Sequence, residues 1–210
     1  MKKILVLGCG LKRFPDAIHL DIKSSQMTNK EALRKNLFRI KELFDEINVT
    51  FCLVWGLALG AYREKDIIDW DNDVDVCVPV SDKFDNDLFL RIANTFRPCV
   101  EWLSYEYAIR DDPNSPRYGT SITFCFKDNS FPNSIEFCVI KGGIATHYCP
   151  KGYMCFPEHM FTHLNTINFL GKSFFIPSDT EKYLEQCYGK NWGIPKKEYN
   201  QDMRWNAKEW

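Results

Sequence analysis

Two aspartates, Asp73 and Asp75, are the residues of this sequence best suited to chemistry, because they alternate with valines in a short apolar segment. Successive side chains of a β-strand point to opposite faces, so the alternation predicts that Asp73, Asp75 and Cys77 share one face. Two carboxylates held this close repel each other unless a cation lies between them. Such oxygen ligands suit Mg²⁺, which commonly takes one or two carboxylates together with substrate phosphates. An exposed acidic loop is the alternative, and it remains open for residues 69–72.

A segment suited to phosphate binding precedes the acidic pair. Residues 50–55 form an apolar run of strand length that Gly56 ends, and Gly60 follows four residues later. Glycine at a turn from strand to helix lets the backbone approach a phosphate, and a helix N-terminus attracts its charge. Arg63 and Lys65 follow within two turns and can complete the cradle. We therefore predict that Gly56, Gly60, Arg63 and Lys65 bind phosphate.

A third carboxylate, Glu136, occurs in the strongly apolar segment 134–141, which we expect to be a strand. The alternation places Glu136 on one face with Cys138 and puts Phe137 on the other. Burying an unpaired carboxylate is costly, so Glu136 is expected to have a partner, such as a metal or a substrate hydroxyl. The alternative is a glutamate on an edge strand that faces water.

The remaining elements follow from periodicity and capping signals. A helix is predicted over residues 28–48, because Thr28 and Glu31 form a capping box ahead of an apolar stripe. Ser81 is predicted to cap a second helix that Pro98 stops, and Ser178 with Glu181 to open a third that ends at Gly189. The other predicted elements are strands over 100–110 and 118–127, an irregular stretch over 142–157, a short helix over 158–164 and a strand or hairpin over 168–176.

Composition limits the classes of function. The chain has 210 residues and a formal net charge of −1, which suits one domain with a small appendage and gives no support for nucleic-acid binding. No apolar run approaches the length of a transmembrane segment. The first ten residues resemble a signal sequence, but their apolar run is too short for one. Nine cysteines without regular spacing favour a reducing cytoplasm.

One group of cysteines and histidines is a candidate zinc site. Two of its histidines are four residues apart, as ligands on one helical turn would be, but no Cys-x-x-Cys pair accompanies them. Buried cysteines with surface histidines are the preferred interpretation. The group consists of His147, Cys149, Cys155, His159 and His163.

The first 27 residues are predicted to form a strand hairpin appended to the core. The strand before Gly8 and Gly10, and the strand ending in Asp21, are similar to the opening of S-adenosylmethionine-dependent methyltransferases. The similarity covers barely twenty residues, and short glycine motifs often arise by chance. A structural hairpin is therefore preferred.

The central motifs resemble the LicD/fukutin family, whose catalytic module has a nucleotidyltransferase-type fold. This sequence departs from the family at Leu57, where a small hydroxyl residue is usual, and at Asn72, which interrupts a run of acids. The family also more often has aspartate at the position of Glu136. The residues that carry the resemblance are Gly56, Leu59, Gly60, Ala61, Arg63, Ile68, Trp70, Asp71, Asp73 and Asp75.

The resemblance implies an α/β (α+β) fold with a nucleotidyltransferase-like mixed sheet flanked by helices over residues 28–192. Residues 193–210 are mostly polar, and we expect them to form a loosely structured tail. It implies a metal-dependent transferase that moves phosphocholine or an alditol phosphate from a CDP-activated donor to a sugar hydroxyl of a glycan. Mg²⁺ or Mn²⁺ would be held by Asp73, Asp75 and Glu136. Glu136 would complete the metal site or accept the proton of the attacking hydroxyl.

Three other functions remain open. The same fold could transfer a nucleotide from an NTP with release of pyrophosphate. The departures at Leu57 and Asn72 are also consistent with a non-catalytic nucleotide-binding relative. A methyltransferase is the least favoured of the three.

Overall fold

The computed structural model describes residues 28–82, 85–106, 121–149 and 152–195 of the chain. The predicted N-terminal hairpin and its methyltransferase-like glycines lie outside the described residues. So do residues 196–210 of the predicted tail, and residues 107–120, which include parts of the strands predicted over 100–110 and 118–127.

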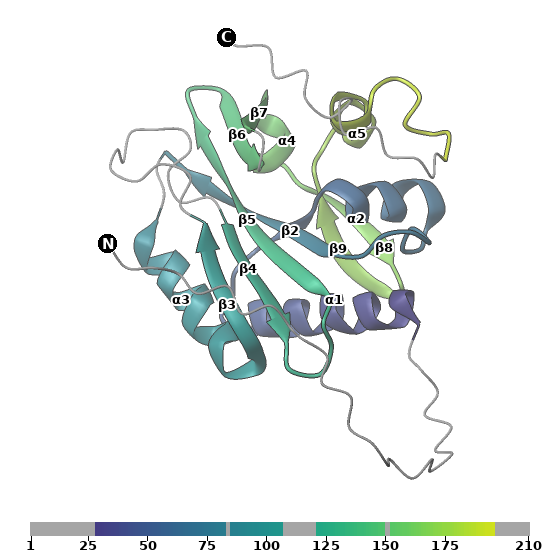
Figure 1. Ribbon diagram of the computed structural model, residues 1–210. Coiled ribbons are helices and arrows are strands. Elements are labelled where there is room, and N and C mark those ends of the chain that lie inside the picture. The colour runs from purple at the N-terminus through teal and green to yellow at the C-terminus, as the bar shows by residue number, and fades with distance from the viewer. Residues whose placement is uncertain (1–27, 83–84, 107–120, 150–151, 196–210) are drawn as a thin grey trace, which may run out of the picture.

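A mixed β-sheet forms the centre of the described structure (Figure 1). Its strands run in the order β3-β4-β5-β2-β1-β9-β8, and β6 and β7 extend from β5. The pairs β2–β5 and β1–β9 are parallel, and the other pairs are antiparallel. The strands are β1 (Cys52–Leu53), β2 (Val74–Ser81), β3 (Val100–Glu106), β4 (Ser121–Phe126), β5 (Pro132–Lys141), β6 (Ile144–Cys149), β7 (Gly152–Pro157), β8 (Asn165–Phe169) and β9 (Lys172–Ile176).

Helices flank this sheet, which confirms the predicted α/β class with a mixed sheet. The long helix α1 crosses the strands on the same side as α3, and α2 and α5 lie near each other elsewhere on the sheet (Figure 1). Helix α2 continues without a break into one π-helical turn, η1. The helices are α1 (Asn29–Glu46), α2 (Trp55–Leu59), η1 (Gly60–Glu64), α3 (Asn86–Phe96), the 3₁₀ turn η2 (Arg97–Cys99), α4 (His159–Thr162) and α5 (Thr180–Tyr188).

Aromatic side chains join α1 and α3 to the sheet. The ring of Phe96 in α3 lies 5.4 Å from Phe44 of α1 and 5.1 Å from Phe124 of β4, both in edge-on geometry. Phe89 of α3 lies 5.6 Å from Phe137 of β5. All five side chains are buried, so the helices cover the face of β5 that carries Phe137 and leave the face of Glu136 to other elements.

The predicted caps are only partly confirmed. Thr28 and Glu31 form the expected capping box at the start of α1. Ser81 does not cap α3, because it is the last residue of β2, and Asp85 accepts the first free amides of that helix instead. The helix does end just before Pro98, as predicted.

The predicted capping box at the start of α5 is also wrong. Asp179 occupies the N-cap position with a φ of 47° and no side-chain cap. The Ser178 hydroxyl donates to the His159 carbonyl, and the Glu181 carboxylate accepts from the Tyr62 hydroxyl. Tertiary partners therefore displace the local contacts that the sequence pattern favoured.

The irregular stretch expected over residues 142–157 is wrong, because the chain there forms the strands β6 and β7. Lys141 pairs with Ile144, so Gly142 and Gly143 form a two-residue hairpin turn, with φ of 61° and 85°. Positive φ at both central residues is the type I′ geometry that Gly-Gly favours. The pair was therefore a hairpin signal. The hairpin around Gly171, the short helix α4 and the end of α5 at Gly189 agree with prediction.

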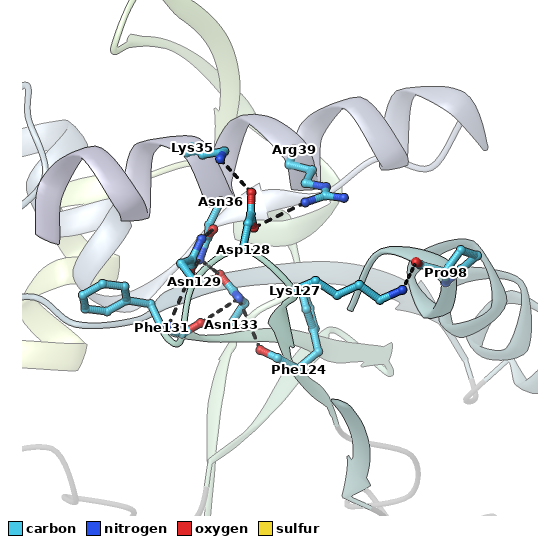
Figure 2. A network of polar contacts seen from close by, with 10 residues as sticks. All are labelled: Lys35, Asn36, Arg39, Pro98, Phe124, Lys127, Asp128, Asn129, Phe131 and Asn133. Atoms are coloured by element: carbon cyan, nitrogen blue, oxygen red, sulfur yellow. Dashed lines mark hydrogen bonds and ion pairs between the residues drawn. The ribbon is translucent and has the colours of Figure 1, made fainter. Parts of the chain in front are cut away.

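A buried amide network ties α1 to the start of β5 (Figure 2). The Asn36 side chain donates to the side-chain oxygens of Asn129, at 3.1 Å, and Asn133, at 2.9 Å. The Asn129 amide donates back to Asn36 at 2.6 Å. The Asn133 amide donates to the backbone carbonyls of Phe124 and Phe131. The network thus fixes the first residues of β5 against the helix.

Charged side chains border the amide network in the same view (Figure 2). Asp128 accepts from Lys35 at 2.6 Å and lies 3.5 Å from Arg39. Lys127 donates to the carbonyl of Pro98. These side chains are partly exposed, and exposed ion pairs add little stability, so the buried amides are the main polar contribution here.

We expect Asn36→Ala to lower the free energy of unfolding by about 1–3 kcal/mol, because it removes the donor to the buried Asn133 Oδ1 and the acceptor of the partly buried Asn129 amide. Urea unfolding followed by circular dichroism measures this change. Glu46→Ala, at an exposed position of the same helix, is the control and should change stability by less than about 0.5 kcal/mol. Equal losses in the two variants would contradict the role given to the network.

Candidate functional site

The acidic pair lies at the start of β2. Asp73 precedes the strand directly, and Asp75 is half-buried within it, between the fully buried Val74 and Val76. Asp75 therefore faces away from the valine side of the sheet, as the alternation predicts.

The register of β2 against β5 places Glu136 on the same face as Asp75. Asp75 pairs with Ser134 and Cys77 pairs with Glu136 in the parallel ladder. Side chains of paired residues point to the same face, so Glu136 follows Asp75 by two residues, roughly 6–7 Å along the strand direction. Strand β5 lies between β4 and β2, and Glu136 is buried. The alternative of an edge-strand glutamate facing water is therefore wrong.

The partners of Glu136 are two aromatic side chains. The indole Nε1 of Trp55 donates to Glu136 Oε2 at 2.7 Å, and His147 Nε2 contacts the same oxygen. A buried carboxylate was expected to need a partner, and it has two from distant parts of the chain. The sequence pattern suggested a metal or a substrate hydroxyl, and it gave no signal for either aromatic residue.

The two glycines of the predicted phosphate turn pack against the loop that leads into β2. A Cβ atom on Gly56 would lie 2.5 Å from Asp71 Oδ2, and one on Gly60 would lie 2.6 Å from the Asp66 carbonyl oxygen. Strand β1 is shorter than predicted, and Trp55 begins α2 with a φ of 48°. Gly56 is therefore inside the first turn of a helix, where its missing side chain makes room for Asp71.

The two basic residues predicted to bind phosphate are both hydrogen bonded within the protein. The Arg63 guanidinium donates to the Trp192 carbonyl at 2.9 Å and to Glu64 at 2.5 Å, and its side chain is 11% exposed. Lys65 is exposed and donates to the Tyr62 carbonyl at 2.9 Å. Lys65 can turn toward a ligand at little cost, whereas Arg63 would have to break two contacts.

Among the residues that the structure describes, no three His, Cys, Asp or Glu side chains lie together as a metal site requires. Asp73, Asp75 and Glu136 thus do not form a cluster of three as they stand, and their joint metal binding stays a prediction. Of the candidate zinc ligands, His159 is exposed and contacts Asp179. His147 is fully buried and contacts Glu136, so the expectation of surface histidines is wrong for His147.

Three cysteine thiols lie next to the site, on the face of the sheet that carries Glu136. Cys52 pairs with Cys77 across β1 and β2, and Cys138 follows Glu136 on β5. All three are fully buried, and burial raises the pKa of each thiol. The thiolate is the reactive form, so these residues act as small apolar side chains.

We expect Gly60→Ala to destabilise the protein more than Gly56→Ala. A new methyl at residue 60 meets the backbone of Asp66, whereas one at residue 56 meets the Asp71 carboxylate, which can rotate away. Overpacking of this kind costs roughly 1–3 kcal/mol, partly offset by alanine's higher helix propensity. Thermal and urea unfolding of both variants measures the ranking.

Gly193→Ala is the matched control, because a Cβ there meets no atom within 4 Å. It should change stability by less than about 0.5 kcal/mol. If Gly60→Ala were as stable as this control, the close approach of the Asp66 backbone would not constrain the loop.

No helix within the described residues has the length and apolar character needed to cross a membrane.

Solved structures resemble the protein over part of its length. A structure of ANT(2″)-Ia in complex with adenylyl-2″-tobramycin covers 69% of this chain and 68% of its own, with a TM-score of 0.41 and 13% identity. A CdnC:HORMA-deltaN complex from E. coli MS115-1 covers 61% of this chain and 41% of its own, with a TM-score of 0.37 and 15% identity.

Curated relatives match a larger share of this chain. Ribitol-5-phosphate transferase FKTN of Macaca fascicularis is 25% identical over 179 residues, and the Homo sapiens protein is 26% identical over 179 residues. The match covers 80% of this chain but only 36% of each relative's length. A sequence profile of the family described as LicD/FKTN/FKRP, nucleotidyltransferase domain, matches residues 48–179. This match spans more than half of the chain and includes Asp73, Asp75 and Glu136, so the chain belongs to the LicD/FKTN/FKRP family.

Proposed function

We propose that the protein transfers a phosphorylated small group from a nucleotide-activated donor to a hydroxyl acceptor. The observation that carries the proposal is the β2–β5 register, which aligns Asp75 and Glu136 on one face of adjacent parallel strands. Membership of the LicD/FKTN/FKRP family supports it, as do the relatives named ribitol-5-phosphate transferase. The finer proposal is a CDP-linked donor of phosphocholine or an alditol phosphate, with a sugar hydroxyl of a glycan as acceptor.

The acidic pair fits a hard divalent cation. Asp73 and Asp75 supply carboxylate oxygens at the start of a rigid strand, and Mg²⁺ needs only one or two protein carboxylates when substrate phosphates complete its ligands. We propose that these two residues hold Mg²⁺ or Mn²⁺, with Glu136 as the third carboxylate. When bound, the cation would neutralise charge on the diphosphate of the donor.

The chain's own residues have separate parts in the proposed reaction. The acceptor hydroxyl oxygen forms a bond to the phosphorus of the transferred group, and the bond to the departing nucleoside monophosphate breaks. Glu136 either completes the metal site or takes the proton of that hydroxyl, in both cases through Oε1, because Oε2 already accepts from Trp55 and contacts His147. Lys65 is placed on the surface, where its ammonium can bind a phosphate of the donor. Arg63 stabilises the same helical turn, η1, through its hydrogen bond to the Trp192 carbonyl.

We expect Asp75→Asn to reduce transfer by at least roughly 100-fold while the fold is kept, because the amide preserves shape and removes the ligand charge. Turnover with a CDP-linked donor gives the rate, and calorimetry with Mn²⁺ gives metal affinity. Asp87→Asn, on an exposed turn of α3, is the control and should match the wild type. Near-full activity of purified Asp75→Asn would refute the assignment of the site.

The choice of donor separates the proposal from nucleotide transfer. We expect a CDP-linked alditol or choline to be consumed with release of CMP, and free NTPs to release no pyrophosphate in the presence of an acceptor glycan. Chromatography of the nucleotide products, with Mg²⁺ and with EDTA, measures both reactions. Release of pyrophosphate from an NTP would instead favour a nucleotidyltransferase. Absence of Mg²⁺ and Mn²⁺ binding by the wild type would favour a non-catalytic relative.

A further inference from the structure

The β6–β7 hairpin carries a buried histidine that the proposed reaction does not yet use. His147 has no exposed surface, and it pairs with Cys138 in the ladder between β5 and β6. Cys138 and Glu136 point to the same face of β5, so the register brings the imidazole to that face. There its Nε2 contacts Glu136 Oε2.

Aromatic neighbours hold the imidazole ring in place. The Trp55 ring lies 4.8 Å from it at 31°, and the Phe161 ring lies 6.1 Å away in edge-on geometry. The Nδ1 atom has no hydrogen-bond partner among the described residues. The contact with Glu136 is therefore the polar contact that orients His147, and Nε2 carries the shared proton when the carboxylate is ionised.

Trp55 itself is fixed from two sides. Its backbone amide donates to the hydroxyl of Tyr183 at 3.1 Å, and its indole donates to Glu136 Oε2. Tyr183 belongs to α5 and is fully buried. The indole donor and the imidazole donor thus come from separate, well-packed elements and meet at one oxygen.

The two contacts to Oε2 of Glu136 also fix the position of its other carboxylate oxygen, Oε1. They restrict rotation of the carboxylate, and no hydrogen bond from a described residue reaches Oε1. The Glu136 side chain keeps 12% of its surface exposed, so it is not sealed within the core. Oε1 is the oxygen left for a substrate hydroxyl or a cation.

We propose that His147 is a positioning residue, which together with Trp55 holds Glu136 so that Oε1 is presented on the face shared with Asp75. The proposal rests on the role given to Glu136 in the proposed function. His147 does not touch the reacting atoms, and its effect passes through the orientation of that carboxylate. The His147 imidazole and the Trp55 indole therefore hold the Glu136 carboxylate in one orientation.

Kinetics of His147→Leu and His147→Gln test the proposal. Leucine removes the donor, whereas glutamine keeps an amide donor of similar reach. We expect His147→Leu to lower kcat by roughly 10–100-fold with little change in the KM for the donor, and His147→Gln to recover part of the loss. A purely structural role would lower the amount of folded protein without this split between kcat and KM.

A spectroscopic readout in the protein without substrate or metal gives an independent test. In a spectrum of ¹⁵N-labelled tryptophan, the Trp55 indole resonance is the one lost in Trp55→Phe. We expect this resonance to lie downfield, because its proton is shared with a carboxylate, and to move upfield in Glu136→Gln. In His147→Leu it should shift or broaden, because the carboxylate is held by one donor instead of two.

Met154→Leu is the matched control, because Met154 is buried and pairs with His147 in the β6–β7 ladder. Its kcat and its Trp55 resonance should equal those of the wild type. Wild-type kcat and an unchanged Trp55 resonance in His147→Leu would overturn the positioning role. If His147→Leu does not fold, His147→Phe decides, because it keeps a buried ring and removes the donor. Wild-type kcat and an unchanged Trp55 resonance in that variant would overturn the positioning role.

The two proposals fail in different ways. Wild-type kcat in Glu136→Gln would remove Glu136 from the proposed reaction, whatever His147 does. A large loss in Glu136→Gln together with wild-type kcat in His147→Leu would refute the positioning role alone.

Discussion

The parallel pairing of β2 with β5 is the constraint on which the candidate site depends. Eight residue pairs, from Val74↔Asn133 to Ser81↔Ile140, fix this register. A slip of one residue would turn Glu136 to the opposite face, under α1 and α3, and would separate it from Asp75. The amide network of Asn36 fixes the first residues of β5 against α1. The helix therefore helps to position the site although it does not line it.

The two faces of the sheet differ in composition and in role. The valine face of β2 and the Phe137 side of β5 are buried under helices, and they supply the apolar area that stabilises the fold. The other face accommodates a buried carboxylate, which is tolerated because two donors satisfy it. Trp55 and His147 belong to α2 and β6, so the polar side of the sheet is assembled only when α2 packs on the sheet and β6 pairs with β5.

The helix that follows β1 has a structural part as well as a proposed chemical one. Gly56 and Gly60 let the 66–71 loop lie close against α2 and η1. The chain continues from this loop into Asp73, so the close contact helps to position that residue. Arg63, predicted from sequence to bind phosphate, is held by Glu64 and the Trp192 carbonyl. The donor-binding assignment of the glycines and of Arg63 stays a prediction, while their packing role is visible in the contacts.

The sequence by itself determined what depends on neighbours along the chain. The alternation at Asp75, the face of Glu136, the capping box of α1 and the family motif were all readable, because strand and helix periodicities act over a few residues. Tertiary structure decided the rest. The contact of His147 with Glu136, and the indole bond to Glu136 from a residue 81 positions away, arise from packing between elements, and no local pattern encodes them. The identity of the partners of a buried charge is therefore settled by which distant side chains the fold brings within hydrogen-bond reach.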